Sequence, residues 1–162
     1  MTVITHARRK SRLSRMIDQV GGVSVGVALT RARENLAALR SRALEEVSRR
    51  LETLAAVPAP VDARDAIGRL EQVYLAANGV IDAGHAFDMD DLCAVSLSLC
   101  DVVDRTAAAL EAGGDDIDWR VIQVHTQSLR LLFTLPADAR VERDQVRARL
   151  TEMVGRKFDQ VG

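Results

Sequence analysis

The stretch that decides the fold runs Leu75-Ala76-Ala77-Asn78-Gly79-Val80-Ile81-Asp82 and, after a short connection, Leu92-Cys93-Ala94-Val95-Ser96-Leu97-Ser98-Leu99-Cys100. Apolar residues recur in both segments every three or four positions, which is the spacing of an amphipathic helix. Gly84 is placed to end the first helix, and Asp88 is placed to cap the second. The two segments therefore predict an antiparallel helical hairpin.

The composition extends this prediction to the whole chain. The 162 residues suffice for one ordinary domain with a core. Aromatic residues make up only 3% of the chain, and there are three prolines. Blocks of β-branched and aromatic residues separated by turn clusters, which strands need, are missing from the sequence. We therefore expect an all-α protein, an antiparallel helical bundle with a long N-terminal helix.

The first half of the chain divides into an arm and a long helix. Residues 1–23 are rich in arginine and end in two glycines, which is typical of a mobile basic arm. Ser24 is expected to cap a helix over 24–57 that Pro58 and Pro60 stop. A helix more than about twice the usual length is expected to project from the domain or to pair with another chain. One hypothesis is therefore a homodimer through residues 25–54. The apolar stripe of this helix is Val25, Leu29, Ala32, Leu36, Leu39, Ala43, Val47, Leu51 and Leu54.

The remaining helices complete a single helical domain over 24–162. Core helices are expected within 62–134, capped by Asp62 and then by Asp116 or Asp118, and a weakly amphipathic C-terminal helix over 137–156. Gly79 costs about 1 kcal/mol relative to alanine inside a helix and is expected to mark a close approach or an irregularity. The residues expected in the core are Ile67, Leu70, Val73, Tyr74, Ala77, Ile81, Leu92, Cys93, Val95, Leu97, Leu99, Cys100, Val103, Thr106, Leu110, Trp119, Ile122, His125, Leu129, Leu132, Phe133, Val141, Val146, Leu150, Met153 and Val154.

The net charge of −1 hides a segregation along the chain. Residues 1–57 hold eleven Lys and Arg against five Asp and Glu, residues 58–118 hold three against thirteen, and residues 119–162 hold eight against five. Two interpretations stay open. Basic outer helices can pack beside an acidic hairpin, or the separated fields can select partners.

Several functional classes are disfavoured by the motifs. The sequence contains no glycine-rich phosphate loop, no histidine pair at metal-ligand spacing and no nucleophile elbow, so we expect no catalytic residues, metal or cofactor. Cys93 and Cys100 are about 10 Å apart along one helix, too far to bridge, and are expected to be buried thiols of a reducing compartment. No apolar run is long enough to insert into a membrane, and the arm lacks the aromatics typical of nucleic-acid binding. We expect a cytoplasmic protein that binds neither nucleic acid nor a membrane.

The segment from Val73 to Asp104, with Leu92, Leu99 and Cys100 in phase, resembles the helical hairpin of histidine phosphotransfer (HPt) domains. That resemblance implies an HPt-like four-helix bundle and places the phosphoacceptor position at Asn78. The assisting lysine of the pattern becomes Ile81, the glycine after it becomes Asp82, and the turn glycine becomes Asp88. The packing pattern is kept while the residues that carry the chemistry are replaced.

Short, ordered segments elsewhere resemble the CheE-type accessory proteins of alphaproteobacterial chemotaxis clusters. This resemblance implies a non-enzymatic regulator beside a chemotaxis kinase and its response regulators, and it provides no catalytic residues to carry over. The matching segments are Ser11-Arg12-Leu13-Ser14-Arg15-Met16-Ile17 with Gly21-Gly22, Glu34-Asn35-Leu36, Ser98-Leu99-Cys100-Asp101 with Asp104, and Trp119 followed by Val124-His125 and Leu129-Arg130-Leu131-Leu132.

Two histidines are alternative phosphoacceptors. His85 has Asp82 and Asp88 at neighbouring helical positions and no Lys or Arg within a turn, so like charges would oppose a phosphoryl group there. His125 has apolar neighbours one turn away and is expected to lie in the core. An active phosphotransfer protein using His85 or His125 is therefore kept as an alternative.

The first hypothesis is a helical adaptor of bacterial chemotaxis or two-component signalling. It would dock a receiver domain or a chemotaxis histidine kinase through a patch made by Asn78, Ile81, Asp82 and His85, without chemistry. The other two hypotheses are the active phosphotransfer protein and a coiled-coil dimerisation module carried by residues 24–57.

Overall fold

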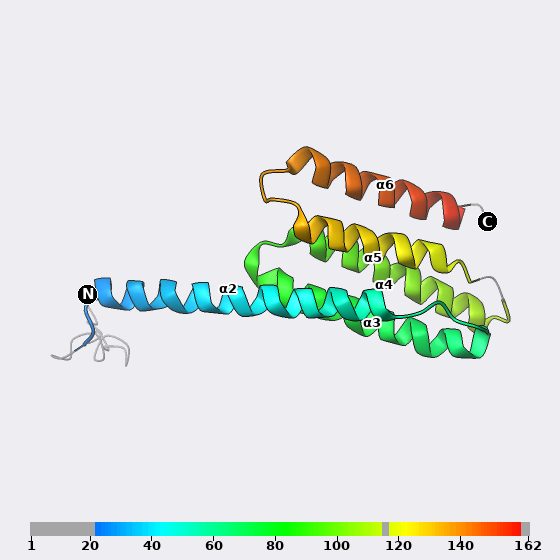
Figure 1. Ribbon diagram of the computed structural model, residues 1–162, viewed down its shortest axis with the longest axis horizontal. Coiled ribbons are helices and arrows are strands. Elements are labelled where there is room, and N and C mark those ends of the chain that lie inside the picture. Colours follow the sequence, from blue (N-terminus) through cyan, green and yellow to red (C-terminus); the bar gives the residue numbers. More distant parts are fainter. Residues whose placement is uncertain (1–21, 115–116, 160–162) are drawn as a thin grey trace, which may run out of the picture. The chain divides into compact units, whose positions relative to one another are not determined.

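A computed structural model describes residues 22–114 and 117–159. The helices are α2 (Val25–Ala56), α3 (Ala63–Gly84), α4 (Asp90–Glu111), α5 (Trp119–Thr134) and α6 (Arg140–Asp159), and a 3₁₀ turn η1 (His85–Phe87) lies between α3 and α4 (Figure 1). None of the described residues forms a strand, so the all-α prediction is confirmed. The predicted arm, apart from its last two residues, lies outside the described ranges.

The chain divides into two units, residues 1–38 and residues 39–162, and the boundary falls inside α2. The helix starts as expected, because the Ser24 hydroxyl accepts a hydrogen bond from the backbone N–H of Val27 at 3.4 Å. In the first unit the described stripe residues are all exposed. In the second unit the same stripe is buried at Ala43, Val47, Leu51 and Leu54.

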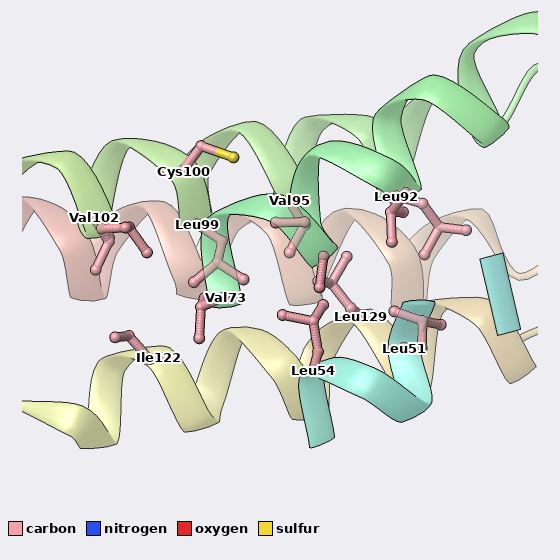
Figure 2. Close-up of a cluster of buried hydrophobic side chains, with 14 of the residues drawn as sticks. Leu51, Leu54, Val73, Leu92, Val95, Leu99, Cys100, Val102, Ile122 and Leu129 are labelled. Atoms are coloured by element: carbon pink, nitrogen blue, oxygen red, sulfur yellow. The ribbon is translucent and has the colours of Figure 1, made fainter. Parts of the chain in front are cut away.

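The second unit is a helical bundle in which successive helices alternate in direction (Figure 1). Helix α3 packs against α4, α4 packs against α5, and α6 packs against both α4 and α5. One apolar cluster joins all five helices. Figure 2 shows Leu51 and Leu54 of α2 among side chains from α3, α4 and α5. The bundle predicted from the hairpin and its short connections is therefore confirmed in this unit.

Four residues predicted to be in the core are exposed instead. They are Ile67 and Tyr74 of α3, Leu97 of α4 and Val141 of α6. Each lies at the edge of its apolar stripe, where the spacing alone cannot distinguish a buried flank from a solvent-facing one. The first three lie on the α3–α4 hairpin, where they bear on the candidate site.

The connection between α3 and α4 differs from the prediction in one respect. Helix α3 ends at Gly84 as expected, but Gly84 keeps a helical φ of −84° and the chain continues into η1. Asp88 is the residue in the left-handed region, with φ 58°. The N-cap of α4 is Met89, which makes no side-chain capping bond, so the expected cap at Asp88 was wrong. Asp88 instead reverses the chain, which an aspartate can do at modest steric cost.

The other helix ends follow capping chemistry. Asp62 accepts a hydrogen bond from the N–H of Asp65 at 2.8 Å, and Asp118 accepts one from the N–H of Arg120 at 3.2 Å. Asp118 is therefore the N-cap of α5, while Asp116 lies outside the described residues. Gly113, with φ 89°, takes the left-handed turn after α4. Helix α6 begins at Arg140 rather than residue 137, because Pro136 first forms a turn in which its carbonyl accepts from the N–H of Ala139.

Candidate docking site

The outer side of the α3–α4 hairpin carries the predicted docking residues. Asn78, Asp82 and His85 are exposed and Ile81 is half-buried, and their spacing of three or four residues places them on one side of α3 and its 3₁₀ extension. The structure therefore brings the four predicted residues together. With their exposed neighbours they form a surface that we call the docking face, made of Ile67, Glu71, Tyr74, Asn78, Ile81, Asp82 and His85 from α3 and η1, and Asp90, Leu97, Asp101 and Asp104 from α4.

The register between the two helices is set near their connection. The Cys93 sulfur lies 3.9 Å from the carbonyl oxygen of Ile81. A Cβ added at Gly84 would lie 3.3 Å from that sulfur, which shows how closely α4 approaches there. Because antiparallel helices advance about 1.5 Å per residue in opposite directions, Leu97 lies at the level of Asn78. Leu97 also lies one turn beyond Cys93, so it shares the side of α4 that faces α3.

Gly79, beside Asn78, is explained by a close approach. It is buried, and a Cβ there would lie only 2.6 Å from Nε of the Arg50 side chain. Arg50 is itself held by Glu46 at 2.7 Å, and the paired Arg49 and Arg50 lower the pKa of the Glu46 carboxyl to about 2. Of the two expectations for Gly79, close approach and irregularity, the structure supports the first.

The docking face is acidic. Between Arg69 and Arg105 the sequence has no Lys or Arg and seven Asp or Glu. Among the described residues only Asp91 of these seven forms an ion pair, to Arg143 at 3.3 Å and Arg147 at 3.0 Å. Three of the unpaired carboxylates also affect the pKa values of the two buried cysteines. Burial, followed by the charges of Asp104 and Asp101, raises the pKa of Cys100 to about 11, and burial with Asp90 raises the pKa of Cys93.

The two candidate phosphoacceptor histidines differ in their surroundings. His85 is exposed, and so are Asp82 and Asp88, three residues before and after it in the chain. His125 lies apart from the docking face, fully buried in α5. Its Nδ1 is 2.8 Å from the carbonyl oxygen of Val121, so Nδ1 carries the proton, and Nε2 then accepts from the Ser98 hydroxyl at 3.1 Å. A phosphoryl group could reach Nε2 only after α4 and α5 separate.

We expect His125 to make the fold sensitive to acid. Burial lowers its pKa in the folded state, while the bond to Val121 opposes that shift. Because the unfolded chain then takes up the proton at a higher pH, the free energy of unfolding should fall as the pH drops below about 6.5 and should not depend on this group above it. Urea titrations at several pH values measure this. His125→Gln should flatten the dependence between pH 7 and 5, and equal slopes for variant and wild type would contradict it.

Three members of the docking face, Ile67, Tyr74 and Leu97, are absent from the predicted patch because their spacing predicts core positions. Leu97 is 55% exposed and Tyr74 is 37% exposed. Their signal was present in the sequence, since Ile67, Tyr74, Asn78, Ile81 and His85 follow helical spacing along one side of α3. The face is consequently more apolar than the four predicted residues imply.

Other kinds of site have little support. Three cavities of about 230, 520 and 230 Å³ open elsewhere on the second unit, and none of the three includes a predicted docking residue. Within 22–114 and 117–159, no three His, Cys, Asp or Glu side chains are arranged to hold a metal ion. No helix in these ranges is both long and apolar enough to span a bilayer. No family profile, curated protein or solved structure matches this chain.

Proposed function

We propose that this protein is a non-enzymatic adaptor of bacterial chemotaxis or two-component signalling, working in the cytoplasm. Its docking face binds a receiver domain or a histidine kinase. The observation that carries the proposal is an exposed amide, Asn78, at the centre of an apolar and acidic hairpin surface. An amide cannot be phosphorylated as an imidazole can, so the surface is suited to binding without phosphoryl transfer.

Two features of the hairpin support a phosphotransfer-like origin. Asp88 occupies the position of the turn glycine in the HPt pattern, and its left-handed φ of 58° is a conformation that favours glycine. Ile81, at the position of the assisting lysine, is half-buried against the core cluster and supplies apolar area to the face. The hairpin thus keeps the left-handed turn of the pattern at Asp88, while an apolar contact residue, Ile81, replaces its charged lysine.

The composition of the docking face favours a protein partner. Exposed Tyr74 and Leu97, with half-buried Ile81, provide an apolar centre, and carboxylates surround it. Interfaces commonly have an apolar centre within a polar rim, and a few central residues supply most of the affinity. The matching partner surface would be apolar at its centre and basic at its edge.

A binding titration with purified receiver and kinase domains from the same bacterium tests this function. Ile81→Arg should weaken binding at least about tenfold, because it places a charge in the desolvated centre. Leu97→Arg should weaken binding similarly. Because Leu97 is exposed, we expect this substitution to leave the fold intact. Val141→Arg is the matched control, because it introduces the same charge at an exposed apolar position of α6 outside the docking face. It should bind with the affinity of the wild type. Equal affinity for the wild type and all three variants would contradict the proposal that partners bind at the docking face.

A phosphotransfer assay separates this proposal from the active-relay alternative. After incubation with phosphorylated receiver or kinase, the adaptor should carry no acid-labile phosphate. Label that disappears in His85→Gln would establish an active phosphotransfer protein instead, since His85 is the accessible histidine of the described residues. Label that disappears in His125→Gln would additionally require opening of the α4–α5 contact.

A further inference from the structure

The N-terminal part of α2 carries a row of exposed apolar residues that the function proposed above does not use. Val25, Leu29, Ala32, Leu36 and Leu39 follow one another at intervals of four and three residues, which aligns them on one side of the helix. Val25 is 76% exposed and Leu36 is 59% exposed. A contiguous exposed apolar row, unlike single exposed leucines, marks an interaction surface. We call these five residues the α2 stripe.

The α2 stripe lies in a basic environment. Residues 25–42 contain Arg31, Arg33, Arg40 and Arg42 against the single acid Glu34. All four arginines are exposed, and none forms an ion pair with another described residue. At 100° per residue, Arg33 and Arg40 lie about 80° and 60° from the middle of the stripe, whereas Arg31 and Arg42 lie about 120° and 100° from it on the other side. The surface therefore suits an apolar partner with an acidic edge.

The docking face has that chemistry. Its apolar members Ile67, Tyr74, Ile81 and Leu97 lie among unpaired carboxylates. The distances also agree, because the α2 stripe is roughly 21 Å long and the α3 side of the docking face is roughly 27 Å long at 1.5 Å per residue. An amphipathic helix laid along an apolar surface of opposite charge is a recurrent mode of protein recognition.

We infer that the α2 stripe of one copy binds the docking face of a second copy of this chain. Pairing α2 with α2 would instead bring arginine-rich segments together, at an electrostatic cost that the acidic face avoids. The contact joins two different surfaces of the chain. Two copies can therefore exchange their α2 stripes in a closed dimer, or successive copies can add to one another in an open chain. It needs no signalling partner, and any partner that binds the docking face would compete with it.

Sedimentation velocity of the full-length chain over a concentration series tests the inference. Wild type should self-associate, and the association should weaken at least about tenfold when sodium chloride rises from about 0.05 M to about 0.5 M. A coiled coil between two α2 stripes predicts the opposite salt dependence, because salt would screen the repulsion between arginines. Association that strengthens with salt would therefore overturn the inference, as would a monomer at every concentration and salt level.

Charge reversal identifies the two surfaces. The first variant, Arg33→Glu with Arg40→Glu, and the second, Asp101→Arg with Asp104→Arg, should each raise the dissociation constant at least about tenfold. Mixing the two variants should restore association, because the acidic stripe of the first then meets the basic face of the second. The control is Arg31→Glu with Arg42→Glu, which makes the same charge change on the same helix. It should raise the dissociation constant much less. Absence of rescue in the mixture would overturn the inference.

Discussion

Leu99→Ala is expected to lower the free energy of unfolding by about 2–5 kcal/mol. The Leu99 side chain is fully buried at the centre of the bundle, in the cluster that joins α4 with Val73 of α3 and Leu129 of α5 (Figure 2). Truncation removes apolar area from the core and leaves a cavity that three packed helices cannot close without moving. Urea unfolding followed by far-UV circular dichroism measures the change.

Leu97→Ala is the matched control, two residues away in the same helix and chemically identical. Because Leu97 is 55% exposed, its truncation should change the free energy of unfolding by no more than about 0.5 kcal/mol. The same substitution should weaken binding at the docking face, so the two variants separate a residue that stabilises the fold from one that contacts a partner. A loss at Leu97 as large as that at Leu99 would place Leu97 in the core and contradict the docking face.

Helix positions were predictable from the sequence because their signals are local. Ser24, Asp62 and Asp118 accept hydrogen bonds from backbone N–H groups two or three residues ahead, and Pro58 follows the end of α2. Each of these signals operates within one turn of the chain. The predicted arrangement of the hairpin follows from them, because a short connection leaves two amphipathic helices little choice but to pack as antiparallel neighbours.

The assignment of the stripe edges was not predictable to the same degree. Leu97 and Cys100 both flank the main apolar row of α4, yet Cys100 is buried and Leu97 is exposed. Which flank is covered depends on where α3 and α5 lie around α4, and that is decided by packing between helices rather than by spacing within one. The same cause places Ile67 and Tyr74 at the surface, which enlarged the docking face beyond its four predicted residues.

The chain reversal before α4 shows a local signal that was assigned to the wrong role. Asp88 was expected to accept a backbone hydrogen bond as an N-cap, because aspartate is a favoured capping residue. Aspartate is also among the few residues that enter the left-handed region at modest cost, and that second property is the one used here. The residue type was informative, but the sequence does not distinguish between its two uses.

Contacts between distant residues carried no signal in the sequence. Ser98 and His125 are 27 positions apart and meet through a hydrogen bond across α4 and α5. The burial of His125 was expected from its neighbours, whereas the partner of its Nε2 was not. Such pairs follow only from the three-dimensional packing, and they include the contact that attaches α6.

Arg143→Ala is expected to lower the free energy of unfolding by about 2–3 kcal/mol, although Arg143 belongs to the least apolar helix. Its guanidinium donates to the carbonyl oxygens of Leu132 at 2.9 Å and Leu135 at 2.7 Å, at the end of α5, and to the carboxylate of Asp91 at 3.3 Å. The Arg143 side chain is only 17% exposed, so water replaces these bonds poorly. Because Leu150 is the only buried apolar residue among those described in α6, this contact should contribute much of the attachment of that helix.

Two further variants decide whether the geometry of the guanidinium matters. Arg143→Lys keeps the charge but cannot donate to several acceptors in fixed directions, so we expect an intermediate loss. Arg149→Ala, on an exposed part of α6, is the matched truncation and should change the free energy of unfolding by no more than about 0.5 kcal/mol. If Arg143→Ala were no more harmful than Arg149→Ala, the contact would not hold α6. Apolar packing around Leu150 and the ion pairs of Arg147 and Lys157 would then have to do so. A loss for Arg143→Lys equal to that for Arg143→Ala would instead assign the stabilisation to the fork of donors and leave none to the charge.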